Sequence, residues 1–290
     1  MLHLWHLLIF SVHPLVISKM SKYVAILFDL DGTLRASLPE GWEAFTEFAG
    51  RVGITLDKAQ MAALEREAHR YWGGRQVDED MARWDKREFW VNYNQYLLNA
   101  IGVEHADTCA VQINDLFDEY DPVDVIFADS RVVLKTLRER GYILGLVSNR
   151  EEDLMPLVEK YGLAEYFHFT LSGGQAGIYK PHAGIFLKAL AMAQPFVAEL
   201  ASTQTIGVTS AATVASAAVT NLPEDESELV SASSALEPDQ VLYVGDNYYA
   251  DVEGARGVNM DSVLIDHRNV FVDFNATRVK RLRDVLQFLD

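Results

Sequence analysis

The sequence contains one cysteine, Cys109, among 290 residues. An intrachain disulfide is therefore impossible, and we expect a reducing, cytoplasmic setting. Basic residues are also scarce, with 25 Lys and Arg against 42 Asp and Glu and a net charge of −17. Such a charge argues against binding nucleic acid or an anionic membrane through bulk electrostatics. A site for an anionic substrate must therefore be made positive locally.

A hydrophobic run long enough to cross a membrane is missing from the N-terminal region. The apolar stretch Leu2–Ile17 is short and is interrupted by Pro14 and three histidines. The first lysine, Lys19, follows this stretch, whereas a signal peptide carries its positive charge before the apolar part. We interpret Met20 as the real start and residues 1–20 as an extension outside the fold, with an interfacial anchor as the alternative.

The first strong pattern is an apolar, β-prone run, Tyr23–Leu27, followed by Phe28-Asp29-Leu30-Asp31-Gly32-Thr33. The run predicts a buried strand of a parallel sheet. Two carboxylates at its end repel each other and lose hydration, costs that a divalent cation such as Mg²⁺ would offset. Gly32 permits a tight turn, and the hydroxyl of Thr33 can bond to an anion. The alternative is a solvated acidic turn without a ligand.

Polar residues follow two later apolar runs in the same way. Tyr142–Val147 ends in Ser148, and Gln240–Val244 is followed by Gly245 and Asp246. Strands that alternate with helices predict an α/β fold with a doubly wound parallel sheet, in which ligands bind outside the carboxyl ends of the strands. Asp29, Ser148 and Asp246 should therefore converge on one site, although Ser148 could simply cap the next helix.

Between the first two strands, residues 36–125 show helical periodicity. We predict an inserted all-helical cap domain, with the core formed by residues 21–35 and 126–290. The aromatic stripe from Trp84 to Tyr96 predicts the core of this domain rather than a ligand-binding wall. Gly73-Gly74 breaks the pattern, so Arg75 could contact substrate or face solvent. The expected helices are Glu40–Val52, Asp57–Tyr71, Asp78–Ala100 and Ala106–Tyr120.

The second half of the chain completes the predicted core. Residues 197–236 are rich in Ala, Ser and Thr with a cluster of acids, which predicts a low-complexity, disordered insertion, although a short helix is also possible. His168 falls within a predicted strand and is expected to be a packed core histidine. The remaining expected elements are helices Ser130–Arg140, Glu151–Tyr161, Ile185–Met192 and Thr277–Leu289 and strands Phe167–Leu171 and Ser262–Ile265.

The D-x-D-G-T pattern at residues 29–33 resembles the first motif of the haloacid-dehalogenase-like (HAD) hydrolase superfamily. Ser148, Lys180 followed by Pro181, and Gly245-Asp246 with Asp251 resemble its three further motifs, in the same order. The inserted helices look like the C1 cap of subfamily I. The resemblance covers roughly residues 21–290 and implies a Rossmann-like core with a helical cap.

This resemblance implies a role for each matching residue. Asp29 would be the nucleophile that forms an aspartyl-phosphate, and Asp31 the acid and base for the leaving group and for water. Mg²⁺ would be held by Asp29, the backbone carbonyl of Asp31 and Asp246, while Asp251 would orient the metal shell or Lys180. Phosphate contacts would come from Ser148 and Lys180. Apart from the resemblance, Thr33, Asn149 and Arg75 are further candidates for contacts with substrate.

The expected function is a Mg²⁺-dependent phosphatase acting on a small phosphorylated metabolite, as a monomer or homodimer. A phosphomutase would use the same residues, and a non-enzymatic regulator on this fold is the alternative of another class. A metal-free dehalogenase on this fold would not resemble the sequence at Asp31 or in the fourth motif.

Overall fold

A six-stranded parallel sheet lies at the centre of the computed structural model, which describes residues 21–212 and 235–289. The strand order is β5-β4-β1-β6-β7-β8, so β1 pairs with β4 on one side and with β6 on the other. This arrangement confirms the predicted α/β class with a doubly wound sheet. The strands are β1 (Ala25–Phe28), β4 (Ile143–Ser148), β5 (Phe169–Ser172), β6 (Val241–Gly245), β7 (Asp261–Ile265) and β8 (Thr277–Val279).

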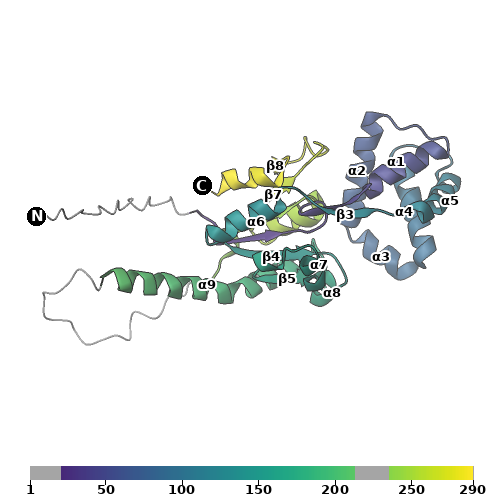
Figure 1. Cartoon of the computed structure of the whole chain (residues 1–290). Helices are drawn as coiled ribbons and strands as arrows, with labels where there is room; N and C mark the ends of the chain where they lie inside the picture. Colours follow the sequence, from purple (N-terminus) through teal and green to yellow (C-terminus); the bar gives the residue numbers. More distant parts are fainter. Residues whose placement is uncertain (1–20, 213–234, 290) are drawn as a thin grey trace, which may run out of the picture.

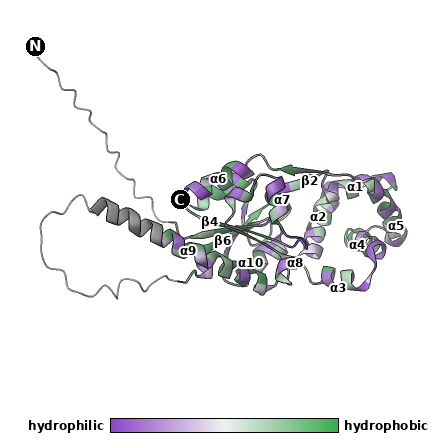
Figure 2. Ribbon diagram, turned by 60° about the horizontal axis from the view of Figure 1, so that its bottom comes forward, coloured by the Kyte–Doolittle hydropathy of each residue, from purple (hydrophilic) through white to green (hydrophobic). Residues whose placement is uncertain are grey.

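Helices cover both faces of this sheet (Figure 2). Side chains of β1 alternate between the faces, as expected for a strand. Ile26 and Phe28 pack with one set of helices, and Ala25 and Leu27 with the other. The first set is α6 (Ser130–Glu139), α7 (Met155–Lys160) and η5 (Leu282–Phe288), and the second is α9 (Ala183–Ala212) and α10 (Gly254–Arg256). Short elements complete the core: η2 (Ala164–Tyr166), α8 (Gly173–Ala176), η3 (Pro238–Gln240) and η4 (Tyr248–Glu253).

Five helices form a second body beyond one end of the sheet (Figure 1), which we call the cap. Asp57 and Asp85 accept backbone N–H groups at the starts of two of them, as N-cap residues do. Phe45, Leu64 and Leu98 lie in the separate apolar core of the cap. Its helices are α1 (Gly41–Arg51), α2 (Lys58–Trp72), α3 (Gln76–Arg83), α4 (Lys86–Ala100) and α5 (Ala106–Leu116), followed by η1 (Phe117–Glu119).

A two-stranded antiparallel sheet connects the cap to the core. It pairs β2 (Arg35–Leu38) with β3 (Val123–Ile126), where the chain leaves the core and returns to it. The sequence analysis did not predict this pair, because each strand has four residues and Val123 is exposed. The pair holds the two connections side by side beside the end of β1.

Two predicted helices differ in the structure. The predicted helix over residues 78–100 is divided into α3 and α4, because Trp84 adopts an extended backbone and Asp85 starts a new helix. The predicted helix Thr277–Leu289 is wrong: residues 277–279 form β8, and a 3-10 helix follows. Val279, Leu282 and Val285 still reach one apolar cluster, because a strand followed by a turn of helix satisfies the same spacing.

The predicted insertion at residues 197–236 also needs correction at both ends. Helix α9 continues to Ala212, and Val197 and Leu200 pack against the core. At the other end Leu236 is buried, and its N–H donates to Gln194 Oε1 at 2.6 Å. Disorder therefore does not begin at Val197. Residues 213–234 lie outside the described residues, as do residues 1–20.

Helix α9 contains a stretch, Ala183–Leu200, that is long and apolar enough to cross a membrane. Its apolar character has a simpler explanation in the fold. Ile185, Phe186, Ala189 and Ala193 form one face that packs against the sheet. One face of this stretch is consequently part of the core, although only 22% of the stretch is buried.

His168 lies directly before β5 and is half-buried, with its ring against that of Phe196. The expected core histidine is therefore packed on one side only. Its Nδ1 accepts the N–H of Leu144 at 2.9 Å, which needs a neutral ring. Burial and the positive charge of Arg138 lower the pKa of His168 to about 4. Because the unfolded-state pKa is higher, this group stabilises the fold above about pH 6.5, and the contribution is lost as the pH falls toward 4.

The variant His168→Asn tests this assignment, since an amide oxygen can accept the same N–H without titrating. The free energy of unfolding, measured by urea denaturation, should fall less in the variant than in the wild type between about pH 7.5 and about pH 4.5. Parallel pH profiles for the two proteins would contradict the assignment.

Candidate active site

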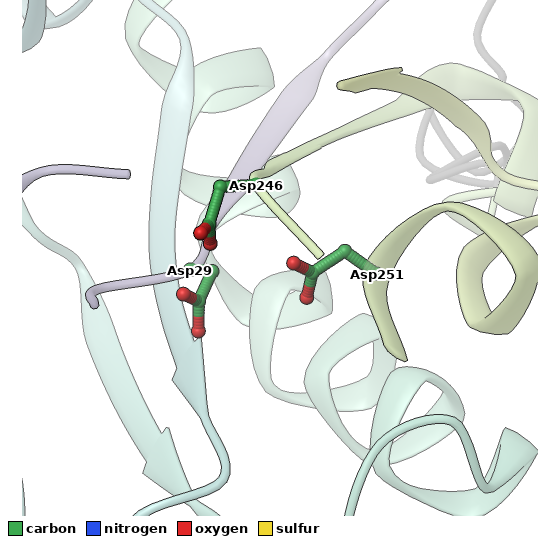
Figure 3. Close-up of side chains that lie close together, drawn as sticks. All are labelled: Asp29, Asp246 and Asp251. Atoms are coloured by element: carbon green, nitrogen blue, oxygen red, sulfur yellow. The ribbon is translucent and has the colours of Figure 1, made fainter. Parts of the chain in front are cut away.

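Three aspartates meet at the carboxyl end of the sheet (Figure 3). Asp29 directly follows β1, Asp246 follows the neighbouring strand β6, and Asp251 lies in η4. One carboxylate oxygen from each lies within 4.8 Å of the other two. The pairing of β1 with β6 explains how residues more than 200 positions apart converge here.

Lys180 lies inside this cluster. Its Nζ donates to Asp29 Oδ1 at 2.6 Å and to Asp251 Oδ1 at 2.7 Å, and the residue is 4% exposed. The side chain of Asn149 fixes the lysine backbone: it accepts from the Lys180 N–H at 2.7 Å and donates to the Lys180 carbonyl at 2.9 Å. The amide of Asn149, predicted to contact substrate, therefore positions Lys180.

The cluster carries more negative than positive charge. Burial raises the pKa of Asp29 to about 7 against the opposing effect of Lys180. Burial and the nearby Asp29 also raise the pKa of Asp246. For Lys180, burial lowers the pKa, but Asp251 and Asp29 outweigh it and raise the pKa well above the ordinary value. Three carboxylates around one ammonium group favour a further cation, and a set of carboxylate oxygens suits Mg²⁺.

Gly32 and Thr33 contact the same cluster. Gly32 has a φ of +75°, and a Cβ there would lie 2.0 Å from Asp246 Oδ2. The hydroxyl of Thr33, which is fully buried, lies 3.4 Å from Asp246 Oδ1. Ser148 ends β4 beside β1 and is 2% exposed. The structure thus brings the predicted site residues Thr33 and Ser148 to the aspartates, and Gly32 makes the tight turn that was expected of it.

Asp31 points to a different set of partners. Its carboxylate accepts from Arg35 and from Arg150, whose Nε and Nη2 lie 2.7 and 2.9 Å away. Arg35 also donates to Asp124 of β3 at 2.6 Å, which ties Asp31 to the connection between core and cap. Sequence reasoning missed Arg150, although its position two residues after Ser148, at the end of a predicted strand, was a usable signal.

Core and cap together enclose a cavity of about 1010 Å³. Asp29, Ser148, Arg150 and Lys180 are among the core residues that line it, and α1, α2, α4 and α5 supply the opposite wall. Trp90 of α4 lies in this wall and is 38% exposed. The interpretation of the whole aromatic stripe as cap core is therefore wrong for Trp90, and Tyr93 also lines the cavity while it packs in the cap.

Arg75 lies outside this cavity, contrary to its predicted contact with substrate. It lines a separate cavity of about 570 Å³, together with Arg70 and Tyr249. The close packing of Gly73 explains the separation: a Cβ there would lie 2.8 Å from atoms of Asn247 and Tyr249. The chain at Gly73 is pressed against the core, and Arg75 emerges beyond this contact.

Polar contacts fasten the cap over the aspartates. Arg268, from the loop after β7, donates to Glu65 of α2 and to Glu40 at 2.9 Å each, and lies 4.7 Å from the ring centroid of Trp42. Asn247 Nδ2 donates to the His69 carbonyl at 3.0 Å. Sequence reasoning also missed Arg268, because nothing in a single loop arginine indicates which acids it will meet.

Comparison with known proteins agrees with this geometry. The family model of haloacid dehalogenase-like hydrolases matches residues 23–259. The chain belongs to the haloacid dehalogenase-like hydrolases. The predicted resemblance to the superfamily is therefore confirmed, and the chain is a hydrolase by family.

Several members of this family are similar to the chain. The haloacid dehalogenase-like hydrolase domain-containing protein 3 of Xenopus laevis is 24% identical over 238 residues, which cover 81% of this chain and 80% of the relative. The phosphoglycolate phosphatase of Yersinia pseudotuberculosis is 27% identical over 170 residues, covering 57% and 65%. The solved structure of a predicted phosphoglycolate phosphatase from Haemophilus somnus shares the fold, with a TM-score of 0.50, 18% identity and coverage of 92% and 98%.

The crowding at Gly32 generates a prediction with a matched control. Gly102 has nearly the same φ, +76°, but nothing lies within 4 Å of its Cβ position. Gly32→Ala should lower the free energy of unfolding by about 1–3 kcal/mol more than Gly102→Ala, because only the first variant forces Asp246 to move. Chemical denaturation of both variants measures the difference, and equal losses would mean that backbone strain alone accounts for Gly32.

Proposed function

We propose that this chain is a Mg²⁺-dependent phosphatase that hydrolyses a small phosphorylated metabolite through an aspartyl-phosphate on Asp29. The observation that carries the proposal is the position of Asp29 at the end of β1, bonded to the buried Lys180 inside a cluster of three carboxylates. The similarity to phosphoglycolate phosphatases of several bacteria supports phosphoryl chemistry. Those enzymes suggest the reaction class, and we do not transfer their substrate to this chain.

Mg²⁺ would be held by Asp29, Asp246 and Asp251, with the carbonyl of Asp31 as a further ligand. When bound, it would neutralise negative charge on the phosphoryl group and on the nucleophile. The carboxylate oxygens suit a divalent cation. Burial raises the pKa values of Asp29 and Asp246, and a nearby cation would stabilise their ionised forms.

Each step of the proposed reaction is then carried out by a residue of the chain. A carboxylate oxygen of Asp29 attacks phosphorus, and the bond from phosphorus to the alcohol oxygen breaks. Asp31, whose carboxylate bonds to Arg35 and Arg150 in this structure, would first take up a proton and then give it to the departing alcohol oxygen. In the second half, Asp31 takes a proton from water as the water oxygen attacks phosphorus, which releases inorganic phosphate and restores Asp29. Lys180 and Ser148 stabilise the phosphoryl oxygens in both halves.

An acidic protein repels an anionic substrate, and the residues that line the cavity bear on how a phosphate ester could still bind. Lys180, Arg150, Arg268 and Lys86 line this cavity, but acids that include Asp29, Asp246 and Asp251 line it too. A bound divalent cation would therefore be needed to make the site positive where the phosphate enters. The cap covers the aspartates and would reduce attack by bulk water on the intermediate. A net charge of −17 is therefore compatible with this substrate class.

Asp29→Asn tests the nucleophile. An amide cannot form the phosphoenzyme, so turnover of p-nitrophenyl phosphate should fall by at least about 1000-fold while the protein stays folded. Asp107→Asn, an exposed aspartate of α5, serves as the control and should keep wild-type turnover. Circular dichroism checks the fold of both variants, and near-normal turnover by Asp29→Asn would refute the mechanism.

Removal of divalent cations tests the metal requirement. EDTA should abolish phosphatase activity, and Mg²⁺ in excess over the chelator should restore it, because the carboxylate cluster needs a cation to bind a phosphate dianion. The measurement is the steady-state rate across a chelator and Mg²⁺ titration. Full activity in the chelator would instead point to metal-free chemistry, which assays with haloacids would then examine.

A further inference from the structure

Helix α4 presents one continuous face to the cavity. Lys86, Trp90, Tyr93, Asn94 and Leu97 all line it, and their spacing is that of one side of a helix. Asn94 is the neutral amide among these five and is only 2% exposed. Its Nδ2 is buried and has no hydrogen-bond partner among the described residues. A buried amide without a partner costs free energy that a leucine at this position would avoid. The cost is removed if a ligand in the cavity supplies the missing partner.

Two tryptophans lie near this amide on the cap side of the cavity. Trp72 and Trp90 are 37% and 38% exposed, and their ring centroids are 5.8 Å apart. Tyr93 holds them in place, because its ring contacts both and its hydroxyl accepts from Trp72 Nε1 at 3.0 Å. The planes of the two indoles are inclined by 49° to each other. A partly exposed indole of fixed orientation is suited to stacking with a planar ring, and at this inclination one such ring can lie flat against only one of the two.

The size of the cavity points in the same direction. A volume of about 1010 Å³ is at the upper end of the range for sites that enclose drug-sized molecules. A phosphate group at Asp29 and Lys180 would fill only the core side of this space. The cap side, with its indoles and its single buried amide, remains for the alcohol part of the substrate.

We propose that the alcohol part of the substrate carries a planar heterocycle, as a nucleoside 5′-monophosphate does, which stacks on one of the indoles of Trp72 and Trp90, touches the other with its edge, and hydrogen-bonds to Asn94. The inference rests on the proposed phosphatase function. A carboxamide offers one donor and one acceptor side by side, which matches the paired donors and acceptors at the edge of such a heterocycle. Asn94 is then a residue that determines specificity rather than a catalytic one.

The test compares a heterocyclic with a small substrate. The kcat/KM for adenosine 5′-monophosphate, cytidine 5′-monophosphate and pyridoxal 5′-phosphate is divided by that for acetyl phosphate, in the wild type and in Asn94→Leu. We expect the variant to lower the ratio for the preferred heterocycle by at least about ten-fold and its melting temperature to be no lower than that of the wild type. Asn99→Leu, an exposed position of α4 outside the cavity, should leave the ratio unchanged. An unchanged ratio in Asn94→Leu would overturn the inference.

Binding of the same heterocyclic phosphates, followed by tryptophan fluorescence, separates this inference from the proposed function. If acetyl phosphate is hydrolysed but no heterocyclic phosphate binds, the inference is wrong and the phosphatase proposal stands. If no phosphate ester is hydrolysed and Asn94→Leu weakens heterocycle binding by about ten-fold, the phosphatase proposal is wrong and the heterocycle site stands. Absence of both hydrolysis and binding would contradict both.

Discussion

The structure depends on one buried ion cluster, in which Lys180 bridges Asp29 and Asp251. Breaking such a cluster by removing one partner leaves an uncompensated buried charge and typically costs several kcal/mol, about 3–5. The cluster joins the end of β1, the segment before α9 and the helix after β6, so it ties together three parts of the core. The same groups, with Asp246, leave an excess of negative charge that a divalent cation would balance. The same side chains therefore contribute both to the stability of the fold and to the proposed reaction.

The second constraint is the contact between cap and core. Arg268 bonds to Glu65 of α2 and to Glu40, which directly precedes α1, and Asn247, directly after Asp246, donates to the His69 carbonyl in the last turn of α2. Because Asn247 follows an aspartate of the cluster, the position of the cap is coupled to the geometry of the site. Gly73 permits this contact, since any larger residue would push α2 away from the core. The cavity exists only between the two bodies, so substrate choice depends on how they fit together.

The sequence allowed the fold class and the meeting of Asp29, Ser148 and Asp246 to be predicted, because strand ends in a parallel sheet share one edge. The position of Arg150 indicated that it lies near the site, but its bond to Asp31 could not be predicted, since that bond depends on how the side chain turns after the strands have paired. Helical periodicity identified the apolar face of α4. It does not show whether that face packs against other side chains or lines a cavity, so Trp90 was wrongly assigned to the core of the cap. The strand β8 escaped prediction because three residues at an edge show no period.

The central claim is that Asp29 becomes covalently phosphorylated. The most direct test mixes the protein with Mg²⁺ and acetyl phosphate, quenches the reaction in acid within its first turnover, and maps the modified peptide by mass spectrometry. The account predicts one added phosphoryl group on the peptide that contains Asp29, lost on treatment with hydroxylamine as expected for an acyl phosphate. A phosphoryl group on another residue, or hydrolysis without any trapped phosphoenzyme, would contradict it.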